Sequence, residues 1–166
     1  MRGRSLVVVF LATVGMVLLF WALVPGGWTE EEATDYRSFY LPVAQNLAEG
    51  RGLVTSEGDP AVRYPLGFPL LLAGLFGSAR WTGTPEVLWL QGFTLLAMGW
   101  AAVGLCGLAW MVVGECGALV AAGLWMTYPF NLWLTKQPNS ELLFLPLFYG
   151  ALLLCGGALW RSWSWS

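Results

Sequence analysis

Asp35 is the first residue whose type and surroundings could support chemistry. It lies in the segment 35–40, DYRSFY, within the only long polar stretch of the chain, residues 25–64. A carboxylate in such a place could deprotonate an acceptor hydroxyl or help to hold a divalent cation such as Mg²⁺ or Mn²⁺. Acidic residues on a polar helix face are usually just solvated, and that interpretation stays open for Asp35.

Arg63 begins a second segment of interest, residues 63–69, RYPLGFP. Two prolines around a glycine form a rigid turn directly before an apolar helix. Arg63 could bind a phosphate group at this turn through its planar guanidinium fork. The alternative is a loop that re-enters a membrane and carries an arginine at the level of the lipid headgroups.

A third polar segment, residues 135–141, contains Lys136 and Glu141. Glu141 begins an apolar helix, where the helix dipole favours an acid and where Ser140 or Asn139 could cap the first turn. This structural role is sufficient to account for Glu141. A catalytic role would require Glu141 to meet Asp35 across an outer cavity.

The chain has no histidine and three cysteines, which narrows the possible chemistry. Without histidine, the commonest general base and every Ser–His or Cys–His nucleophile are excluded. Cys106, Cys116 and Cys155 lie in or beside apolar runs, and their odd number argues against a disulfide framework. Any catalysis must therefore rest on carboxylates, on a cation that they hold, or on basic groups that face a phosphate.

The composition indicates an integral membrane protein. Of the 166 residues, 57% are hydrophobic and only 11% are charged, whereas about 25% are charged in an ordinary soluble domain. The formal net charge of −2 offers no basic face for nucleic acid. These values exclude a water-soluble globule, a disordered tail and a nucleic-acid-binding protein.

Four apolar runs predict transmembrane helices, because about 20 helical residues cross a hydrocarbon core of about 30 Å. They are residues 5–24, 87–113, 117–134 and 142–160. Arg2 and Arg4 precede the first run, which predicts a cytoplasmic amino terminus. The loop 25–85 and the turn 135–141 are then non-cytoplasmic, and a turn near Gly114 is cytoplasmic. The predicted fold is therefore an all-α polytopic membrane domain of about four spans.

The first external loop, residues 25–85, is expected to carry surface helices. Apolar residues recur at three- and four-residue steps over residues 33–47, which predicts an amphipathic helix at the membrane surface. Thr29 and Glu32 have the spacing of a capping box at its start, and Pro42 should kink or split it. The apolar run 66–77 is too short to cross and predicts a re-entrant or interfacial helix.

Small residues recur on one face of the run 87–113. Ala97, Ala101 and Gly104 follow one another at four- and three-residue steps. Such a stripe lets another helix approach closely. Ordinary small-residue filler in an apolar helix is an equally good interpretation.

The order of several short motifs resembles the amino-terminal part of the GT-C glycosyltransferases. It is closest to the multi-pass enzymes related to protein O-mannosyltransferases and lipid A aminoarabinose transferases, and the resemblance covers nearly the whole chain. In order, the motifs are Asp35-Tyr36 with Tyr40 and Ala44, Gly50-Arg51-Gly52, Tyr64-Pro65-Leu66-Gly67-Phe68-Pro69 with the following LLLA, Tyr128-Pro129, and Ser140-Glu141-Leu142-Leu143-Phe144.

The resemblance implies sugar transfer from a polyprenyl-phosphate carrier to a lipid, glycan or protein acceptor on the outer face of a bacterial inner membrane. Asp35 matches the acid that carries catalysis in the first external loop of the family, and Glu141 matches a second acid. Arg63, Arg37 and Lys136 are candidates to bind the lipid phosphate. Many relatives have two adjacent acids where this chain has Asp35 and then Tyr36, so no metal site is assigned.

The length of the chain bears on this interpretation. Members of the family generally have around ten or more spans, so the four expected here suggest an amino-terminal fragment that does not turn over substrate alone. Partner helices from another chain would then complete the fold. The alternative is a small non-catalytic membrane subunit that packs with partner helices through the stripe at residues 97–104. A transporter is a poorer choice, because no charged residue lies in mid-span.

Overall fold

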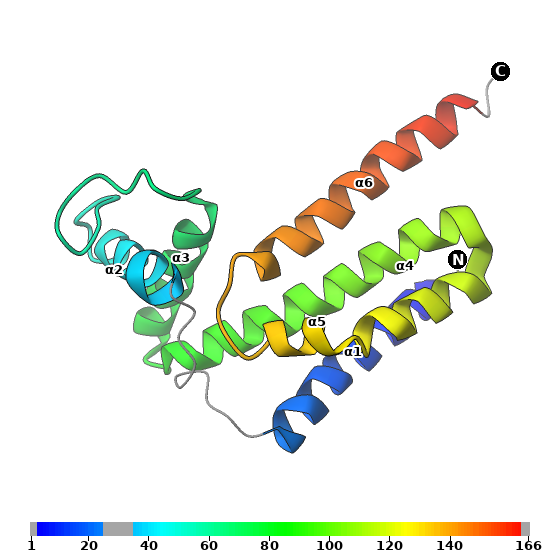
Figure 1. The fold of residues 1–166 in the computed structure, drawn as a ribbon, viewed down its shortest axis with the longest axis horizontal. Coiled ribbons are helices and arrows are strands. Elements are labelled where there is room, and N and C mark those ends of the chain that lie inside the picture. Colours follow the sequence, from blue (N-terminus) through cyan, green and yellow to red (C-terminus); the bar gives the residue numbers. More distant parts are fainter. Residues whose placement is uncertain (1–2, 25–34, 164–166) are drawn as a thin grey trace. The chain divides into compact units, whose positions relative to one another are not determined.

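The computed structural model describes residues 3–24 and 35–163, and this part of the chain is all-helical, with no strand. Figure 1 shows the order of the elements along the chain. They are α1 (Gly3–Leu23), the π-helix η1 (Tyr36–Tyr40), α2 (Leu41–Ala48), α3 (Gly67–Thr82), α4 (Glu86–Met126), α5 (Pro129–Leu134) and α6 (Glu141–Trp163). The predicted fold class is therefore confirmed as all-α.

The contacts between residues divide the chain into two compact units. Unit 1 comprises Met1–Pro25, Thr94–Lys136 and Glu141–Ser166, and unit 2 comprises Gly26–Phe93 and Gln137–Ser140. Unit 1 therefore contains the predicted spans, apart from the first turns of α4. Unit 2 contains most of the predicted external loop.

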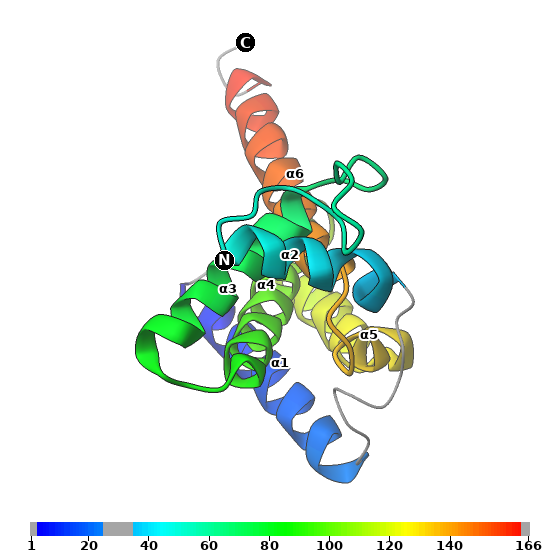
Figure 2. The ribbon, with the colours of Figure 1, turned by 90° about the vertical axis from the view of Figure 1, so that its left-hand side faces the viewer.

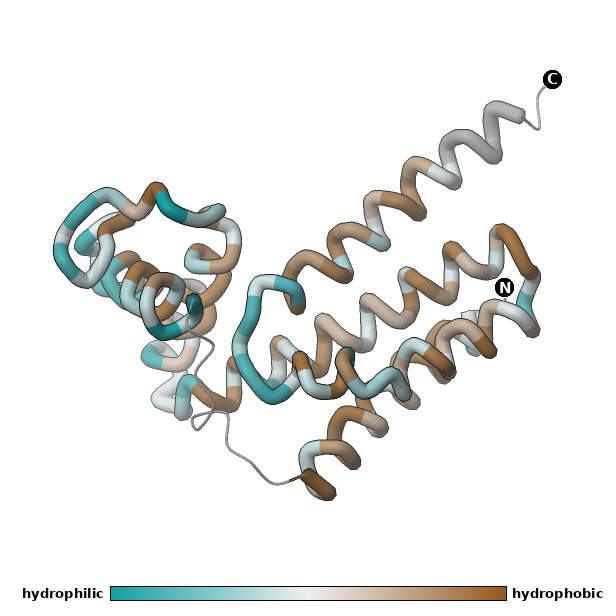
Figure 3. Tube along the Cα trace, in the orientation of Figure 1, coloured by the Kyte–Doolittle hydropathy of each residue, from teal (hydrophilic) through white to brown (hydrophobic). Residues whose placement is uncertain are grey.

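Two helices, α1 and α4, are long and apolar enough to cross a membrane by length and composition. α1 confirms a helix over the predicted first run, residues 5–24. Apolar residues dominate both helices, whereas hydrophilic residues gather in the connecting loops (Figure 3). α6 is also apolar, and Pro146 lies inside it.

The direction of the chain reverses inside α4 at Gly114. This residue has φ 74° and ψ −175°, a conformation that is open essentially to glycine alone. Residues 86–113 form a first arm. Residues 115–134, which include α5, form a returning arm that runs in the opposite direction (Figure 1). The prediction of a turn near Gly114 is therefore confirmed, and the first arm agrees with the predicted run 87–113.

The returning arm is not the single helix that was predicted over residues 117–134. Helix α4 ends at Met126, and α5 begins at Pro129. Tyr128 between them is extended, with φ −65° and ψ 121°. The proline ring disfavours helical backbone at the preceding residue, so Pro129 can start a helix but cannot continue one through Tyr128.

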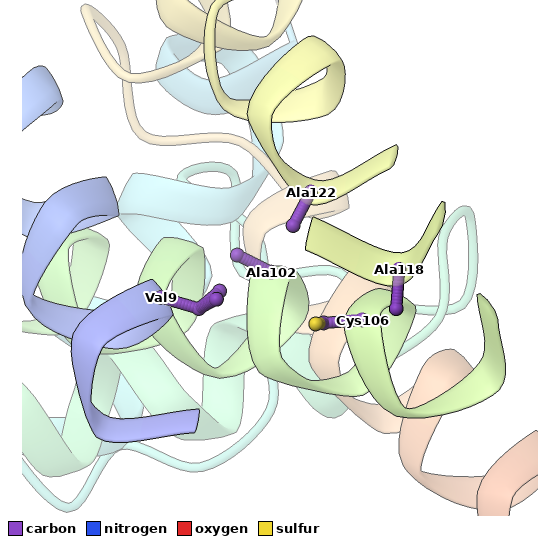
Figure 4. Packing of buried hydrophobic residues seen from close by; sticks show 5 residues of the cluster. All are labelled: Val9, Ala102, Cys106, Ala118 and Ala122. Carbon is purple, nitrogen blue, oxygen red and sulfur yellow. The ribbon is translucent and has the colours of Figure 1, made fainter. Parts of the chain in front are cut away.

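Small side chains form the core of unit 1. Figure 4 shows Val9 of α1 beside Ala102 and Cys106 of the first arm, together with Ala118 and Ala122 of the returning arm. All five are at most 3% exposed. Because alanine adds little bulk, the two arms can pack closely against each other and against α1.

Helix α6 packs against the first arm at glycine. A Cβ built on Gly104 would lie 2.7 Å from the Cβ of Tyr149, and one on Gly107 would lie 3.0 Å from a methyl carbon of Leu153. Ala97 and Ala101 are also buried. The stripe of small residues therefore lies inside unit 1, which corrects the expectation that it offers a surface for a partner helix.

Both ends of α1 are tied to the ends of the returning arm. Near its start, the Ser5 hydroxyl donates a hydrogen bond to Glu115 over 2.8 Å. Near its end, the Trp21 indole donates to the Thr135 hydroxyl over 2.9 Å. These contacts place the Gly114 turn beside the first turns of α1, and residue 135 beside its last turns.

In unit 2, α2 and α3 lie side by side (Figure 2). The predicted amphipathic helix is not split at Pro42. Tyr40 and Leu41 both have helical backbone angles, so η1 continues directly into α2, and the hydrogen-bond pattern changes from π to α just before the proline. The helix predicted over residues 66–77 is confirmed as α3, which continues to Thr82. Thr29 and Glu32, the proposed capping box, lie outside the described residues.

The loop between α2 and α3 is held by side chains of both helices. The Asn46 amide donates hydrogen bonds to the carbonyls of Val54 and Thr55, each over 2.9 Å. Glu49 at the end of α2 forms ion pairs with Arg51 and Arg80. These contacts hold the first part of the loop, residues 51–55, against the end of α2 and link the end of α2 to α3.

Candidate functional site

The structure joins two of the three polar segments that the sequence singled out. The Tyr64 hydroxyl donates a hydrogen bond over 3.0 Å to Oδ1 of Asp35, although the two residues are 29 positions apart. Asp35 is exposed at the start of η1, and Tyr64 is half-buried in the turn before α3. A carboxylate of the first segment is therefore held by the turn of the second.

Arg63 completes this arrangement from the same turn. Its guanidinium carbon lies 5.2 Å from the centre of the Tyr64 ring, within the range of a cation–π contact. The side chain is exposed. The candidate site is defined here as Asp35, Tyr64 and Arg63. The Tyr64 side chain contacts the Asp35 carboxylate through its hydroxyl and the Arg63 guanidinium through its ring.

Four aromatic rings form the platform under the candidate site. The ring centroids of Phe39 and Tyr64 are 5.0 Å apart, those of Tyr40 and Tyr64 are 5.6 Å apart, and those of Tyr40 and Phe68 are 5.2 Å apart. Phe39, Tyr40 and Phe68 are buried. The Phe39–Tyr64 and Tyr40–Phe68 contacts are edge-to-face, a geometry that aromatic pairs prefer, and the Tyr40–Tyr64 contact is tilted. Packing against Phe39 and Tyr40 gives the Tyr64 ring a defined position.

The hydrogen bond has an electrostatic consequence for Tyr64. Donation to the Asp35 carboxylate raises the pKa of the Tyr64 phenol, and loss of hydration adds to this effect. Arg63 acts in the opposite direction, because its positive charge favours the phenolate. Tyr64 therefore remains a hydrogen-bond donor through the neutral pH range.

Arg37 and Tyr36 lie next to Asp35 in η1. Arg37 is exposed. Burial raises the pKa of Tyr36 to about 12, the negative charge of Glu86 also raises it, and Arg37 lowers it. Tyr36 is consequently neutral at any physiological pH and cannot act there as a base.

Lys136 and Glu141 belong to unit 1, whereas the candidate site belongs to unit 2. The Lys136 ammonium donates to the carbonyl of Val24 and lies 5.4 Å from the centre of the Phe20 ring. These contacts place Lys136 at the carboxyl end of α1, where a positive charge is favourable. Glu141 is exposed at the first position of α6, in agreement with its predicted place at the start of a helix.

No group of three or more Cys, Asp or Glu side chains among residues 3–24 and 35–163 is arranged to hold a metal ion. The general-base interpretation needs only one free carboxylate oxygen. Oδ1 accepts from Tyr64, and Oδ2 faces no hydrogen-bond donor within the described part of the chain.

Sequence reasoning overlooked Tyr64 itself. It chose the segment 63–69 for its arginine and its prolines, and it treated the tyrosine only as part of a motif. A usable signal was present, because Phe39, Tyr40, Tyr64 and Phe68 concentrate aromatic rings in an otherwise polar region. Such rings need partners when they leave water, which predicts mutual packing.

Comparisons with known proteins give no relative for this chain: no family model, no curated protein and no solved structure matches it.

Proposed function

We propose that this chain is the amino-terminal portion of a GT-C-type membrane glycosyltransferase. It would transfer a sugar from a polyprenyl-phosphate donor to an acceptor hydroxyl on the non-cytoplasmic face. The observation that carries the proposal is the hydrogen bond between Tyr64 and Asp35. It unites the acid and the proline-rich turn, which are the two motifs on which the resemblance to this family mainly depends.

The chemistry fits the groups in the candidate site. Asp35 would take the proton of the acceptor hydroxyl through Oδ2, while the acceptor oxygen forms a bond to the anomeric carbon of the sugar. The bond from that carbon to the phosphate oxygen breaks, and the lipid phosphate leaves with the electron pair. Arg63, which lies beside Tyr64 in the same turn, would stabilise the negative charge on the departing phosphate.

A topology of four spans belongs to this proposal. Ser5 contacts Glu115 and Trp21 contacts Thr135, so the returning arm runs parallel to α1 and ends at the same level as α1. If α1 crosses the membrane with Arg4 inside, the Gly114 turn is cytoplasmic and residues 35–85 are outside. Helix α6 would be the fourth span, and Lys136 and Glu141 would lie on the outer side as candidate phosphate-binding and acidic residues.

A non-catalytic membrane subunit is the second candidate, and one observation favours it. Val8 and Leu11 on α1 are 64% and 61% exposed, respectively, so one apolar face of this helix is uncovered. A partner helix could pack there without using the filled stripe of the first arm. This function requires no role for Asp35.

The test compares two isosteric changes in native membranes from cells that carry the altered gene. Asp35→Asn removes the proposed base and should lower sugar transfer from polyprenyl-phosphate hexose or pentose to endogenous acceptors by about 10²–10⁴-fold. Asp59→Asn is the matched control, because Asp59 is an exposed acid of the same loop whose carboxylate forms no hydrogen bond or ion pair within the described residues.

The control should keep transfer within about twofold of the unaltered protein, since surface changes are usually neutral. Equal transfer in both variants would show that Asp35 is an ordinary solvated acid. If membranes from cells with and without the gene transferred sugar equally from every polyprenyl-phosphate donor, the glycosyltransferase proposal would be wrong. The non-catalytic subunit would then be the better proposal.

A further inference from the structure

We infer that Tyr64 is a positioning residue that aligns Asp35 and Arg63 on one rigid support. The inference rests on the proposed function, because it assigns a role within the same site. It goes beyond that proposal by adding a residue that makes no bond to the reacting atoms. Three contacts of the Tyr64 side chain support this role.

The first contact fixes the carboxylate. Asp35 is exposed at the start of η1, where an aspartate side chain without a partner would sample several rotamers. The 3.0 Å hydrogen bond from Tyr64 selects the rotamers in which Oδ1 points at the phenol. The other oxygen, Oδ2, then keeps one orientation toward solvent, as a general base requires.

The second contact fixes the phenol. The Tyr64 ring packs 5.0 Å from Phe39 and 5.6 Å from Tyr40, and both partners are buried. These rings come from η1, the same element that Asp35 begins. The Tyr64 ring therefore packs on η1, the helix that Asp35 precedes. This packing keeps the Tyr64 hydroxyl within hydrogen-bonding distance of the Asp35 carboxylate even if the rest of the loop moves.

The third contact places the cation. Arg63 lies 5.2 Å over the Tyr64 ring, and a long arginine side chain on an exposed turn would otherwise be free to move. The contact uses the face of the ring and not its hydroxyl. Removal of the hydroxyl and removal of the ring should consequently have separate effects on the reaction.

Two variants separate these effects in the native membranes of the previous test, with polyprenyl-phosphate hexose or pentose as donor. Tyr64→Phe keeps the ring and loses the hydroxyl, so kcat should fall about tenfold while KM for the donor stays within twofold. Tyr64→Leu also removes the support of Arg63, and KM should rise in addition. Tyr40→Phe is the control, because it removes a hydroxyl that is not bonded to Asp35 from the same aromatic cluster.

A second readout needs no substrate. NMR titration of isotope-labelled tyrosine in the detergent-solubilised chain follows Tyr64, whose signal is identified by its loss in Tyr64→Phe. In Asp35→Asn, the phenol no longer donates to a charged acceptor, so its pKa should fall toward the ordinary value near 10. An unchanged Tyr64 titration in Asp35→Asn would overturn the inference.

The outcomes distinguish this inference from the function on which it rests. If Asp35→Asn abolishes transfer but Tyr64→Phe behaves like Tyr40→Phe, then Tyr64 positions nothing and the proposed function stands. If Asp35→Asn leaves transfer intact while the Tyr64 titration still responds, the contact is real, but the general-base role of Asp35 and the positioning role of Tyr64 both fail. A tenfold loss in kcat with an altered titration supports both.

Discussion

At the scale of single residues, the two tyrosines that flank Asp35 resist ionisation for different physical reasons. Tyr64 does so because it donates to a carboxylate, whereas Tyr36 does so mainly because it is removed from water. Both effects exist only while unit 2 is folded, so both link the stability of this unit to pH.

Tyr36→Phe is expected to reduce the loss of stability at high pH. The folded state holds the Tyr36 proton up to about pH 12, while the unfolded chain releases it near pH 10. Between these values the folded state binds more protons, so its stability falls as the pH rises. Thermal unfolding in detergent between about pH 9 and about pH 11 measures this slope, which should be shallower in Tyr36→Phe.

Tyr128→Phe provides the comparison, because Tyr128 is an exposed tyrosine of the same chain. Its slope should equal that of the unaltered chain. Equal slopes for Tyr36→Phe and the unaltered chain would show that burial of Tyr36 does not contribute to the pH dependence.

Lys136→Met tests whether Lys136 supports α1 or binds a phosphate. The ammonium contacts the Val24 carbonyl at the end of α1, so its loss should destabilise unit 1 by about 0.3–1 kcal/mol, as for other charges at helix ends. Thermal unfolding in detergent measures this change. An unchanged melting temperature with a raised KM for polyprenyl-phosphate donor would instead assign Lys136 to the lipid phosphate.

The identity of Asp35 and Arg63 as candidates was predictable from residue type and from the turn chemistry around Pro65. The bond that joins them through Tyr64 was not. Tyr64 and Asp35 are 29 positions apart, and the contact depends on how the loop after α2 closes. Backbone bonds within the loop and the side chains of Asn46 and Glu49 take part in this closure, and their partners cannot be chosen from sequence spacing alone.

At the scale of helices, close approach between α4 and α6 depends on residues without a side chain. Gly104→Ala should destabilise unit 1 by about 1–3 kcal/mol, because the new Cβ would meet the Tyr149 Cβ and force the helices apart. Chemical denaturation in mixed detergent micelles provides the measurement.

Gly150→Ala on α6 is the matched control and should have the opposite sign. A Cβ at Gly150 meets nothing within 4 Å, so the change should stabilise the helix by about 0.5–1 kcal/mol through backbone entropy. Stabilisation by both substitutions would show that α6 does not pack on the first arm as described.

Hydrophobic runs predicted the helices α1, α3 and the first arm of α4, because long apolar stretches favour helix wherever the backbone must satisfy its own hydrogen bonds. The same criterion failed for the returning arm. The predicted run was continued through Tyr128 to residue 134, whereas the conformation at this point is decided by the ring of Pro129. The proline at position 129 was a local signal for this break, and the prediction from apolar composition did not use it.

At the scale of the whole molecule, the contacts of α1 predict opposite sides for two exposed positions. A cysteine at the exposed Ser56, in a background with all three native cysteines replaced by alanine, should react with an impermeant thiol reagent added to intact cells. The native Cys116, exposed beside the Gly114 turn, should react only after lysis when Cys106→Ala and Cys155→Ala are present.

Each of the two cysteines controls for the other, because both are exposed in the folded chain. Labelling of Cys116 in intact cells, with Ser56→Cys protected until lysis, would invert the orientation and place Asp35 in the cytoplasm. Labelling of both in intact cells would show that α1 does not separate them.

The two hydrogen bonds between α1 and the returning arm join segments of different length at both ends. From Ser5 to Trp21 is about 16 residues, or about 24 Å of helix, whereas from Glu115 to Thr135 is about 20 residues, or about 30 Å if helix were continuous. The returning arm thus has a surplus of about four residues, and the break at Tyr128 takes it up. In a thinner or thicker bilayer, the mismatch would be absorbed at this break while α1 keeps its length.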